Sequence, residues 1–158
     1  MYIQLLYMKE LENILKSTTK ISDAKTTVIS VFHINNIIKD ALLFQLKPYD
    51  LSIEQYNVLR ILRGQKGNPI NLQDIQERMI NKMSNTTRLV DKLLKKDFVK
   101  RITCKKNRRK VEISITKTGL EILKELDPKI DGTESKITSP LNPKELKQLN
   151  NLLLKLNN

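Results

Sequence analysis

The spacing of apolar residues changes after Asp97, and this change limits the folds open to the chain. Before it, apolar residues recur every three or four positions, which is the spacing of amphipathic helices. After it, residues 98–103 and 111–116 have the composition of strands, and the second segment alternates apolar and polar side chains. The loop 104–110 between them holds five cations in seven positions. The pattern predicts helices followed by a β-hairpin with an exposed basic tip.

Capping residues and apolar spacing predict a mainly α protein of the α+β type. Ser52, Asn71 and Ser84 are expected to cap successive helices. With 3 Phe, 4 Tyr and no Trp, the 158 residues suit helices packed on helices in one domain. The predicted helices span about 9–18, 23–46, 52–63, 71–79, 84–96, 118–126 and 143–156, with a polar loop at 131–142.

All the surplus positive charge lies between Arg60 and Lys117. This segment holds 17 Lys and Arg against 5 Asp and Glu, a net charge of +12, while the rest of the chain holds 12 against 12. Charge concentrated on one module creates a local field that attracts polyanions. Nucleic acid is therefore the first partner to consider.

The two helices at 71–79 and 84–96 have the lengths and order of a helix-turn-helix. On a helical wheel the second helix has an apolar side that anchors it and a free side with short polar groups and then cations. Such a side suits base edges and phosphates, and the hairpin arginines suit the minor groove. Thr86 mostly supports the helix start, and Thr87 lies at the border of the two sides. Arg88 could instead form a structural salt bridge, for instance to Asp91 in its own helix or to a residue elsewhere in the fold. The candidate DNA-binding residues are Ser84, Asn85, Thr87, Arg88, Lys92, Lys95, Lys106, Arg108 and Arg109.

Three motifs give the chain a resemblance to the MarR (multiple antibiotic resistance regulator) family, over roughly residues 51–128. They occur in the family's order: Ile53-x-Gln55-Tyr56-x-Val58-Leu59, Thr87-Arg88-Leu89-Val90-Asp91-Lys92-Leu93 and Arg108-Arg109-x-Val111-x-Ile113-x-Ile115-Thr116-x-x-Gly119. One departure is Asn107, where the family's wing motif usually has Asp. The resemblance implies a winged helix-turn-helix with a two-stranded wing, in a homodimeric transcriptional regulator whose terminal helices interlock.

This resemblance implies dimerisation segments at 1–50 and 118–158 around a DNA-binding lobe at 51–117. The apolar stripes near both ends independently need a partner surface. Our dimerisation candidates are Val28, Val31, Phe32, Leu149, Leu152, Leu153 and Leu156. Resembled regulators often release DNA when a small aromatic molecule binds. Plausible lining residues, which core packing would explain equally well, are Phe32, Phe44, Tyr49 and Tyr56.

The remaining residue types argue against other functions. No nucleophile beside a base, glycine-rich phosphate loop or spaced carboxylate pair indicates an enzyme, and no cofactor is expected. One His and one Cys make a metal site from those types improbable; His33 is expected in the core or an interface. Cys104 is interpreted as a strand-end residue rather than a redox sensor.

We expect a cytoplasmic protein, because a single Cys allows no internal disulfide and the apolar amino terminus lacks the basic lead of a signal peptide. No stretch approaches the roughly 20 apolar residues of a membrane span. The leading hypothesis is a repressor that binds a pseudo-palindromic operator on double-stranded DNA. The alternative is a basic architectural or RNA-binding module, although segment 60–117 offers only Phe98 for base stacking.

Overall fold

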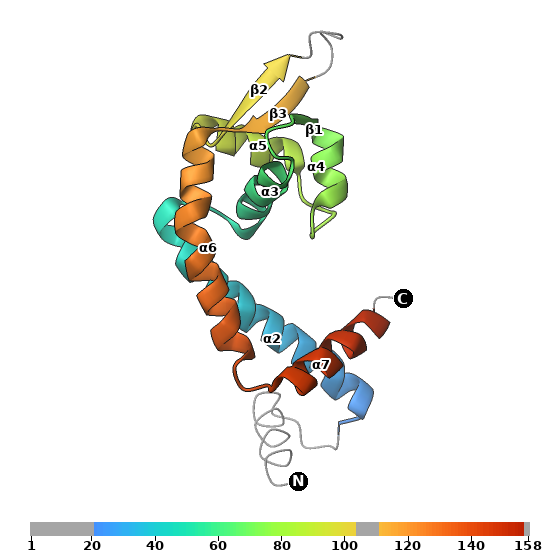
Figure 1. The fold of residues 1–158 in the computed structure, drawn as a ribbon. Helices are drawn as coiled ribbons and strands as arrows, with labels where there is room; N and C mark the ends of the chain where they lie inside the picture. Colours follow the sequence, from blue (N-terminus) through green and yellow to red (C-terminus); the bar gives the residue numbers. More distant parts are fainter. Residues whose placement is uncertain (1–20, 104–110, 157–158) are drawn as a thin grey trace. The chain divides into compact units, whose positions relative to one another are not determined.

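The computed structural model describes residues 21–103 and 111–156 (Figure 1). The chain is mainly helical with a small antiparallel sheet, which confirms the predicted fold class. The predicted helix at 9–18 and the basic loop 104–110 lie outside the described residues. In chain order the elements are α2 (Asp23–Leu46), the 3-10 helix η1 (Lys47–Tyr49), α3 (Ile53–Gly64), β1 (Ile70–Asn71), α4 (Leu72–Arg78), α5 (Thr86–Lys95), β2 (Val99–Thr103), β3 (Val111–Ile115), α6 (Lys117–Thr138) and α7 (Pro143–Lys155).

Side-chain caps fix where the first helices of the lobe begin. Ser52 and Gln55 form a capping box on α3, in which Gln55 N donates to Ser52 Oγ at 3.2 Å and Ser52 N donates to Gln55 Oε1 at 2.9 Å. Asn71 Oδ1 accepts a hydrogen bond from Asp74 N at 2.9 Å at the start of α4. Both starts were predicted from the sequence, because a capping side chain needs only residues three positions away.

The sheet has three strands in the order β1–β3–β2, and β3 is antiparallel to both neighbours. Ile70 of β1 pairs with Ile113, and Val99 of β2 pairs with Ile115. The sequence predicted the hairpin of β2 and β3 but not β1. Two residues are too short to show an alternating pattern, so β1 is defined only by its pairing with β3.

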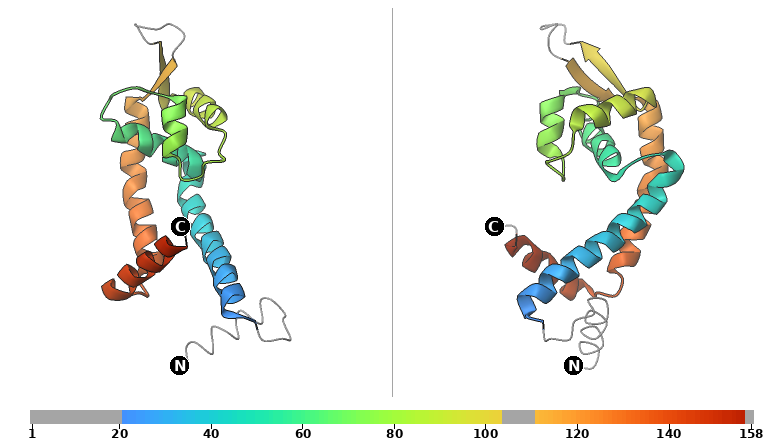
Figure 2. Two further views of the ribbon diagram at one scale, coloured as in Figure 1. Left: turned by 90° about the vertical axis from the view of Figure 1, so that its right-hand side faces the viewer. Right: turned by 180° about the vertical axis from the view of Figure 1, so that it is seen from behind.

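One hydrophobic core joins the helices α3, α4 and α5 to the sheet and to the first half of α6. Figure 2 shows the three short helices gathered beside the base of the hairpin, with α6 alongside. Fully buried side chains come from each of these elements. They include Val58, Leu59, Leu62, Ile75, Val90, Leu93, Val99, Ile113, Leu123 and Leu126. This core orients α5, because the buried side of that helix is set by its neighbours.

The helix α6 is longer than the sequence predicted. A break near residue 126 and a polar loop from 131 were expected, but the helix continues through Pro128 to Thr138. Proline lacks the amide hydrogen of one helical bond, yet it lies on the exposed side of the helix. Ile130 beyond it is only 2% exposed, and Ile137 keeps the same helical spacing at intermediate burial. Burial of this continued stripe offsets the lost hydrogen bond.

The helix α2 is largely exposed along its length. Its start agrees with the predicted cap, since Lys25 N lies 3.4 Å from Ser22 Oγ, and only Leu46 is buried within it. Residues Asp23–Tyr49 are long and apolar enough to cross a membrane by length and composition alone, with a mean hydropathy of 1.2 in the most apolar window. The sequence expectation that no such stretch exists was therefore too strict. The chain divides into two compact units within this helix, between Asp40 and Ala41.

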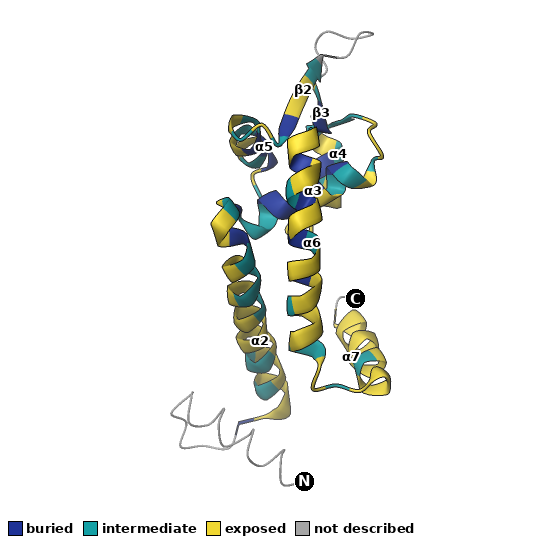
Figure 3. Cartoon of the chain, turned by 60° about the vertical axis from the view of Figure 1, so that its left-hand side comes forward, coloured by how far each residue is buried: buried dark blue, intermediate teal, exposed yellow. Residues whose placement is uncertain are grey.

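The helix α7 begins at a second capping box and buries no residue. Asn142 Oδ1 accepts from Glu145 N at 3.0 Å, and Glu145 Oε2 accepts from Asn142 N at 2.9 Å. In Figure 3 this helix is exposed along nearly its whole length, although leucine dominates its second half. The capping box defines where the helix begins, but its apolar side has no partner among the described residues.

Candidate nucleic-acid interface

The helix α5 separates a buried side from an open one. Thr86, Val90 and Leu93 are 5%, 0% and 0% exposed, because they pack into the lobe. The side chains on the opposite side are all exposed, and we call this set the outer face of α5. It consists of Asn85, Thr87, Arg88, Lys92 and Lys95. The sequence predicted each of these residues as a DNA contact, and the structure brings them together on one surface.

The amino end of α5 differs from the prediction in which Ser84 was the cap. Asn85 is the capping residue, and its Oδ1 accepts a hydrogen bond from Arg88 N at 3.0 Å. Ser84 Oγ is buried and has no hydrogen-bond partner among the described residues. Thr86, which follows Asn85, is buried in the core. Because the Ser84 hydroxyl is buried, it is not presented on the open side, whereas Asn85 keeps its amide NH2 group for other partners.

The two helices of the motif are joined by a hydrogen bond that sequence reasoning missed. Thr86 Oγ1 donates to Gln76 Oε1 of α4, and Gln76 Nε2 in turn donates to the carbonyl of Lys82 in the connecting turn. Gln76 thus holds both the turn and the start of α5. The supporting role predicted for Thr86 is confirmed, but nothing in the sequence identified its partner.

Arg88 does not form the predicted alternative ion pair with Asp91. Asp91 pairs with Arg101 of β2 instead, which links α5 to the wing. Within the described ranges, the guanidinium of Arg88 has no ion-pair partner, and its side chain is exposed. The sequence places Arg101 in a strand, but only the packing of β2 beside α5 shows what it binds.

A pocket of about 380 Å³ lies along the outer face of α5. Glu54 of α3 contributes a carboxylate to it, beside Arg88 and Lys92. The other lining residues are Asn81, Ser84, Asn85 and Leu89. Glu54, in the first turn of α3, was not among the candidate contacts, and its place at this surface follows from the packing of α3 against α5.

Cations continue around the carboxyl end of α5. Lys96 Nζ lies 2.6 Å from Asp50 Oδ2 and also donates to the Asp50 carbonyl. This hydrogen bond and the charge of Lys96 lower the pKa of Asp50 below its ordinary value. Asp50 also has a left-handed backbone with φ of 50°. The pair therefore fixes the turn that precedes α3 against the end of α5.

The tip of the wing lies outside the described residues, and with it the predicted contacts Lys106, Arg108 and Arg109, as well as Cys104. The two strands that carry this tip are described, and β2 is paired with β3 over five residues on each strand, from Val99↔Ile115 to Thr103↔Val111. The base of the wing is thus held by the same core that orients α5.

The predicted dimerisation residues are all exposed. Val28, Val31 and Phe32 on α2 are 54%, 40% and 66% exposed. Leu149, Leu152, Leu153 and Leu156 at α7 are 40%, 51%, 44% and 66% exposed. His33 is exposed as well, so it does not lie in the core of this chain, and the interface alternative stays a prediction. The apolar residues beside it on α2 are likewise uncovered within the described residues, and their place in a dimer interface stays a prediction.

The four residues predicted as an aromatic lining differ in their burial. Phe32 and Phe44 are exposed, whereas Tyr56 is 6% exposed and donates to Asp127 Oδ1 at 3.1 Å. Burial, followed by this hydrogen bond, raises the pKa of Tyr56 to about 12. Tyr49 OH donates to Glu125 Oε2 at 3.1 Å and accepts from Lys129 Nζ at 2.6 Å. Tyr56 of α3 and Tyr49 of η1 thus both bind residues of α6.

Within residues 21–103 and 111–156, no three His, Cys, Asp or Glu side chains are grouped as a metal site would require.

The fold and the outer face of α5 define a winged helix-turn-helix protein. The MarR family model matches residues 51–111. This match and the solved structures that resemble the chain confirm the resemblance to that family.

Among curated proteins, the uncharacterized HTH-type transcriptional regulator YfiV of Bacillus subtilis is 36% identical over 77 residues, which are 49% of this chain and 47% of YfiV. The chain spans about half the length of the curated relatives that it matches.

Two solved structures share the fold. A mutant MarR from E. coli complexed with operator DNA has a TM-score of 0.71 and 22% identity, over 85% of this chain and 99% of that one. BpsR of Bordetella bronchiseptica, whose DNA binding is regulated by 6-hydroxynicotinic acid, has a TM-score of 0.76 and 18% identity, over 89% and 99%.

Proposed function

We propose that this chain is a cytoplasmic transcriptional regulator that binds double-stranded DNA sequence-specifically. It acts as a repressor, in the form of a homodimer on a pseudo-palindromic operator whose half-sites lie about one helical turn apart. The observation that carries the proposal is the outer face of α5, where polar and cationic side chains are exposed while the opposite side is buried.

The outer face has the chemistry of a major-groove reader. Arg88 can donate two parallel hydrogen bonds to guanine, and the free amide of Asn85 can donate to base acceptors. Lys92 and Lys95 follow one and two turns further along, where ammonium groups suit phosphates. The MarR structure with operator DNA supports this use of the shared fold.

The first experiment measures binding of the purified chain to DNA from its own upstream region by fluorescence anisotropy. We expect salt-sensitive binding that is at least about a thousandfold tighter than binding to random duplex. Equal affinity for every duplex, or preference for single-stranded RNA, would favour the basic architectural or RNA-binding alternative.

Two substitutions at Arg88 test whether it contributes to DNA binding through hydrogen bonds to bases or only through its positive charge. Arg88→Ala and Arg88→Lys should both reduce operator binding by about ten- to a hundredfold, because lysine retains the charge but not the planar fork. Arg109→Ala, at the wing, should also weaken binding. Each variant should keep the wild-type melting temperature, since Arg88 is exposed. A matched loss of thermal stability would instead give Arg88 a structural role.

Lys92→Ala tests the phosphate contacts. It should weaken operator and random duplex alike and reduce the slope of log affinity against log salt by about one unit. Lys124→Ala, which removes an exposed lysine from α6, is the control and should change neither quantity. A change in base preference for Lys92→Ala would contradict its assignment to phosphate.

The homodimer is supported by the exposed apolar residues on α2 and α7. We assign residues 1–50 and 118–158 to dimerisation and 51–117 to DNA binding. The α2 helix fits a protein partner better than a bilayer, because Lys39 and Asp40 would each cost about 2.5–3.5 kcal/mol at the centre of a membrane. Light scattering after gel filtration should give twice the mass of the 18.4 kDa chain.

Release of DNA by a small aromatic ligand completes the proposal. The regulation of BpsR by 6-hydroxynicotinic acid supports it, since the two chains share a fold. A panel of aromatic acids, with 6-hydroxynicotinic acid among them, should contain a compound that saturably dissociates the operator complex. A complex unaffected by every compound, at fixed ionic strength and pH, would remove this part of the proposal.

A further inference from the structure

A second, smaller pocket lies where the start of α3 meets the end of α5. Its volume is about 220 Å³. The lining residues are Asp50, Gln55, Lys92, Lys95 and Lys96. Lys92 lines both this pocket and the one along the outer face of α5. The two pockets therefore share one cation.

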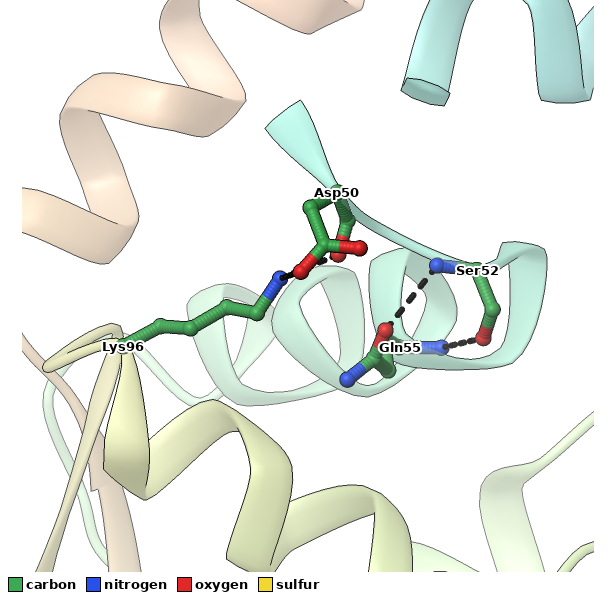
Figure 4. Close-up of polar contacts among 4 residues, drawn as sticks. All are labelled: Asp50, Ser52, Gln55 and Lys96. Atoms are coloured by element: carbon green, nitrogen blue, oxygen red, sulfur yellow. Dashed lines mark hydrogen bonds and ion pairs between the residues drawn. The ribbon is translucent and has the colours of Figure 1, made fainter. Parts of the chain in front are cut away.

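The side chain of Gln55 is buried with its amide donor unused. Gln55 is 4% exposed, and its Nε2 atom has no hydrogen-bond partner among the described residues. The capping box identifies the oxygen and the nitrogen of the Gln55 amide, because only the oxygen Oε1 can accept from Ser52 N. Figure 4 shows Nε2 turned away from Ser52, on the side of Gln55 where Lys96 lies. A buried N–H group without an acceptor is unfavourable, so a ligand that accepts from it would be stabilised.

The charges around Gln55 favour an anionic acceptor. Lys96 is bound to Asp50, and this pair is close to neutral. Lys92 and Lys95 are exposed and form no ion pair within the described ranges. Asp50 is the one carboxylate that lines the pocket, and Lys96 compensates its charge. The groups that remain are therefore one amide donor and two ammonium donors.

We propose that this pocket binds a phosphate-type oxyanion, held by Gln55 Nε2 and the ammonium groups of Lys92 and Lys95. The oxyanion has two possible sources, a backbone phosphate of a bound duplex or free inorganic phosphate. Only the first source rests on the proposed DNA binding. Free phosphate in the pocket would draw Lys92 away from the outer face of α5, so it would compete with duplex.

Gln55→Glu is the sharpest variant, because glutamate retains the cap acceptor while replacing the amide donor with a negative oxygen. Glutamate is a standard partner in a capping box and suits the first turn of a helix, but it places a carboxylate at a buried position, so the melting temperature of the variant is measured first. The control is Asn68→Asp, an equal change of charge at an exposed residue beyond the other end of α3. Lys95→Gln is a second variant, at an exposed position where folding is not at risk.

The first arm titrates the full chain with inorganic phosphate at constant ionic strength and follows amide peaks by NMR. The Gln55 side-chain peak is assigned by its absence from Gln55→Glu. We expect saturable shifts of this peak and of the backbone amides of residues 50–55 in wild type and in Asn68→Asp. The backbone shifts should vanish in Gln55→Glu and should need about tenfold more phosphate in Lys95→Gln.

The second arm measures duplex binding in phosphate-free buffer. If a backbone phosphate uses the pocket, Gln55→Glu should bind duplex about tenfold more weakly than Asn68→Asp. If free phosphate is the source, the two variants should bind duplex equally, and added phosphate should weaken binding only in wild type and Asn68→Asp.

Two results would overturn the site. One is a phosphate response that persists unchanged in Gln55→Glu. The other is the absence of a phosphate response in wild type together with equal duplex binding by Gln55→Glu and Asn68→Asp. If the chain binds no duplex, the proposed function is wrong, but the oxyanion site is not excluded. The phosphate titration of the first arm then tests this site by itself.

Discussion

The helices α3 and α7 have similar lengths and carry similar apolar stripes, yet only one of them is covered. Val58, Leu59 and Leu62 of α3 are at most 2% exposed, whereas Leu152 and Leu153 of α7 are about half exposed. Each helix begins with a capping box, so their local starts are equally well defined. The difference shows that an amphipathic sequence specifies a helix but not what covers it. In α3 the stripe stabilises the fold, and in α7 it remains available for association.

The largest expected loss of stability comes from a substitution in the buried apolar stripe of α3. Leu59→Ala should lower the free energy of unfolding by about 2–5 kcal/mol, because Leu59 is 0% exposed and its removal leaves a cavity. Urea denaturation followed by circular dichroism, at several protein concentrations, measures this loss. A loss below about 1 kcal/mol would mean that the core of the lobe is not packed around α3.

A close contact at the start of α6 gives the next largest effect. A Cβ atom on Gly119 would lie 2.2 Å from the Phe98 carbonyl oxygen and 2.9 Å from Ile115 Cγ1. Gly119→Ala should therefore cost about 1–3 kcal/mol, because that oxygen accepts from Thr116 N and cannot easily move. Gly132→Ala, in the same helix with nothing within 4 Å, is the control and should stabilise it by about 0.5–1 kcal/mol. Equal effects at both sites would refute the contact.

A smaller change in stability is expected at high pH, and it tests the hydrogen bond between Tyr56 and Asp127 of α6. The pKa of Tyr56 is about 12 in the folded chain and about 10 in the unfolded one. The unfolded state thus loses this proton first, so the contribution of Tyr56 to stability should be constant below about pH 10 and should be lost between about pH 10 and 12. Tyr56→Phe should show a shallower fall over that range. Tyr49→Phe is the comparison variant, and identical curves for wild type and Tyr56→Phe would contradict the shifted pKa.

The smallest effect on folding is expected at the uncovered stripe. Leu152→Glu should change the unfolding free energy of the monomer by less than about 0.5 kcal/mol, because Leu152 is 51% exposed. The same variant should shift sedimentation equilibrium toward monomer, and Lys147→Glu, on an exposed residue of the same helix, tests for a mere charge effect. If Leu152→Glu associates as strongly as wild type, the apolar stripe of α7 does not mediate dimerisation.

The candidate site could be predicted in part because it depends on one helix. The exposed positions Asn85, Thr87 and Arg88 follow from helical spacing once Val90 and Leu93 are assigned to the core. The contacts that hold this helix could not be predicted in the same way. Gln76, Arg101 and Glu54 come from other elements, and their partners are set by packing rather than by spacing.

The sequence by itself determined the features that act over a few residues. These are the capping boxes, the periods of the helices and of the hairpin, and the concentration of positive charge between Arg60 and Lys117. Tertiary structure decided the features whose free energy comes from distant partners. It defined the strand β1, extended α6 past Pro128, placed the α5 cap at Asn85 rather than Ser84 and brought Gln55 into a pocket lined by Lys92, Lys95 and Lys96. Local hydrogen bonds can be inferred from neighbouring residues, whereas burial depends on which surfaces the fold brings together.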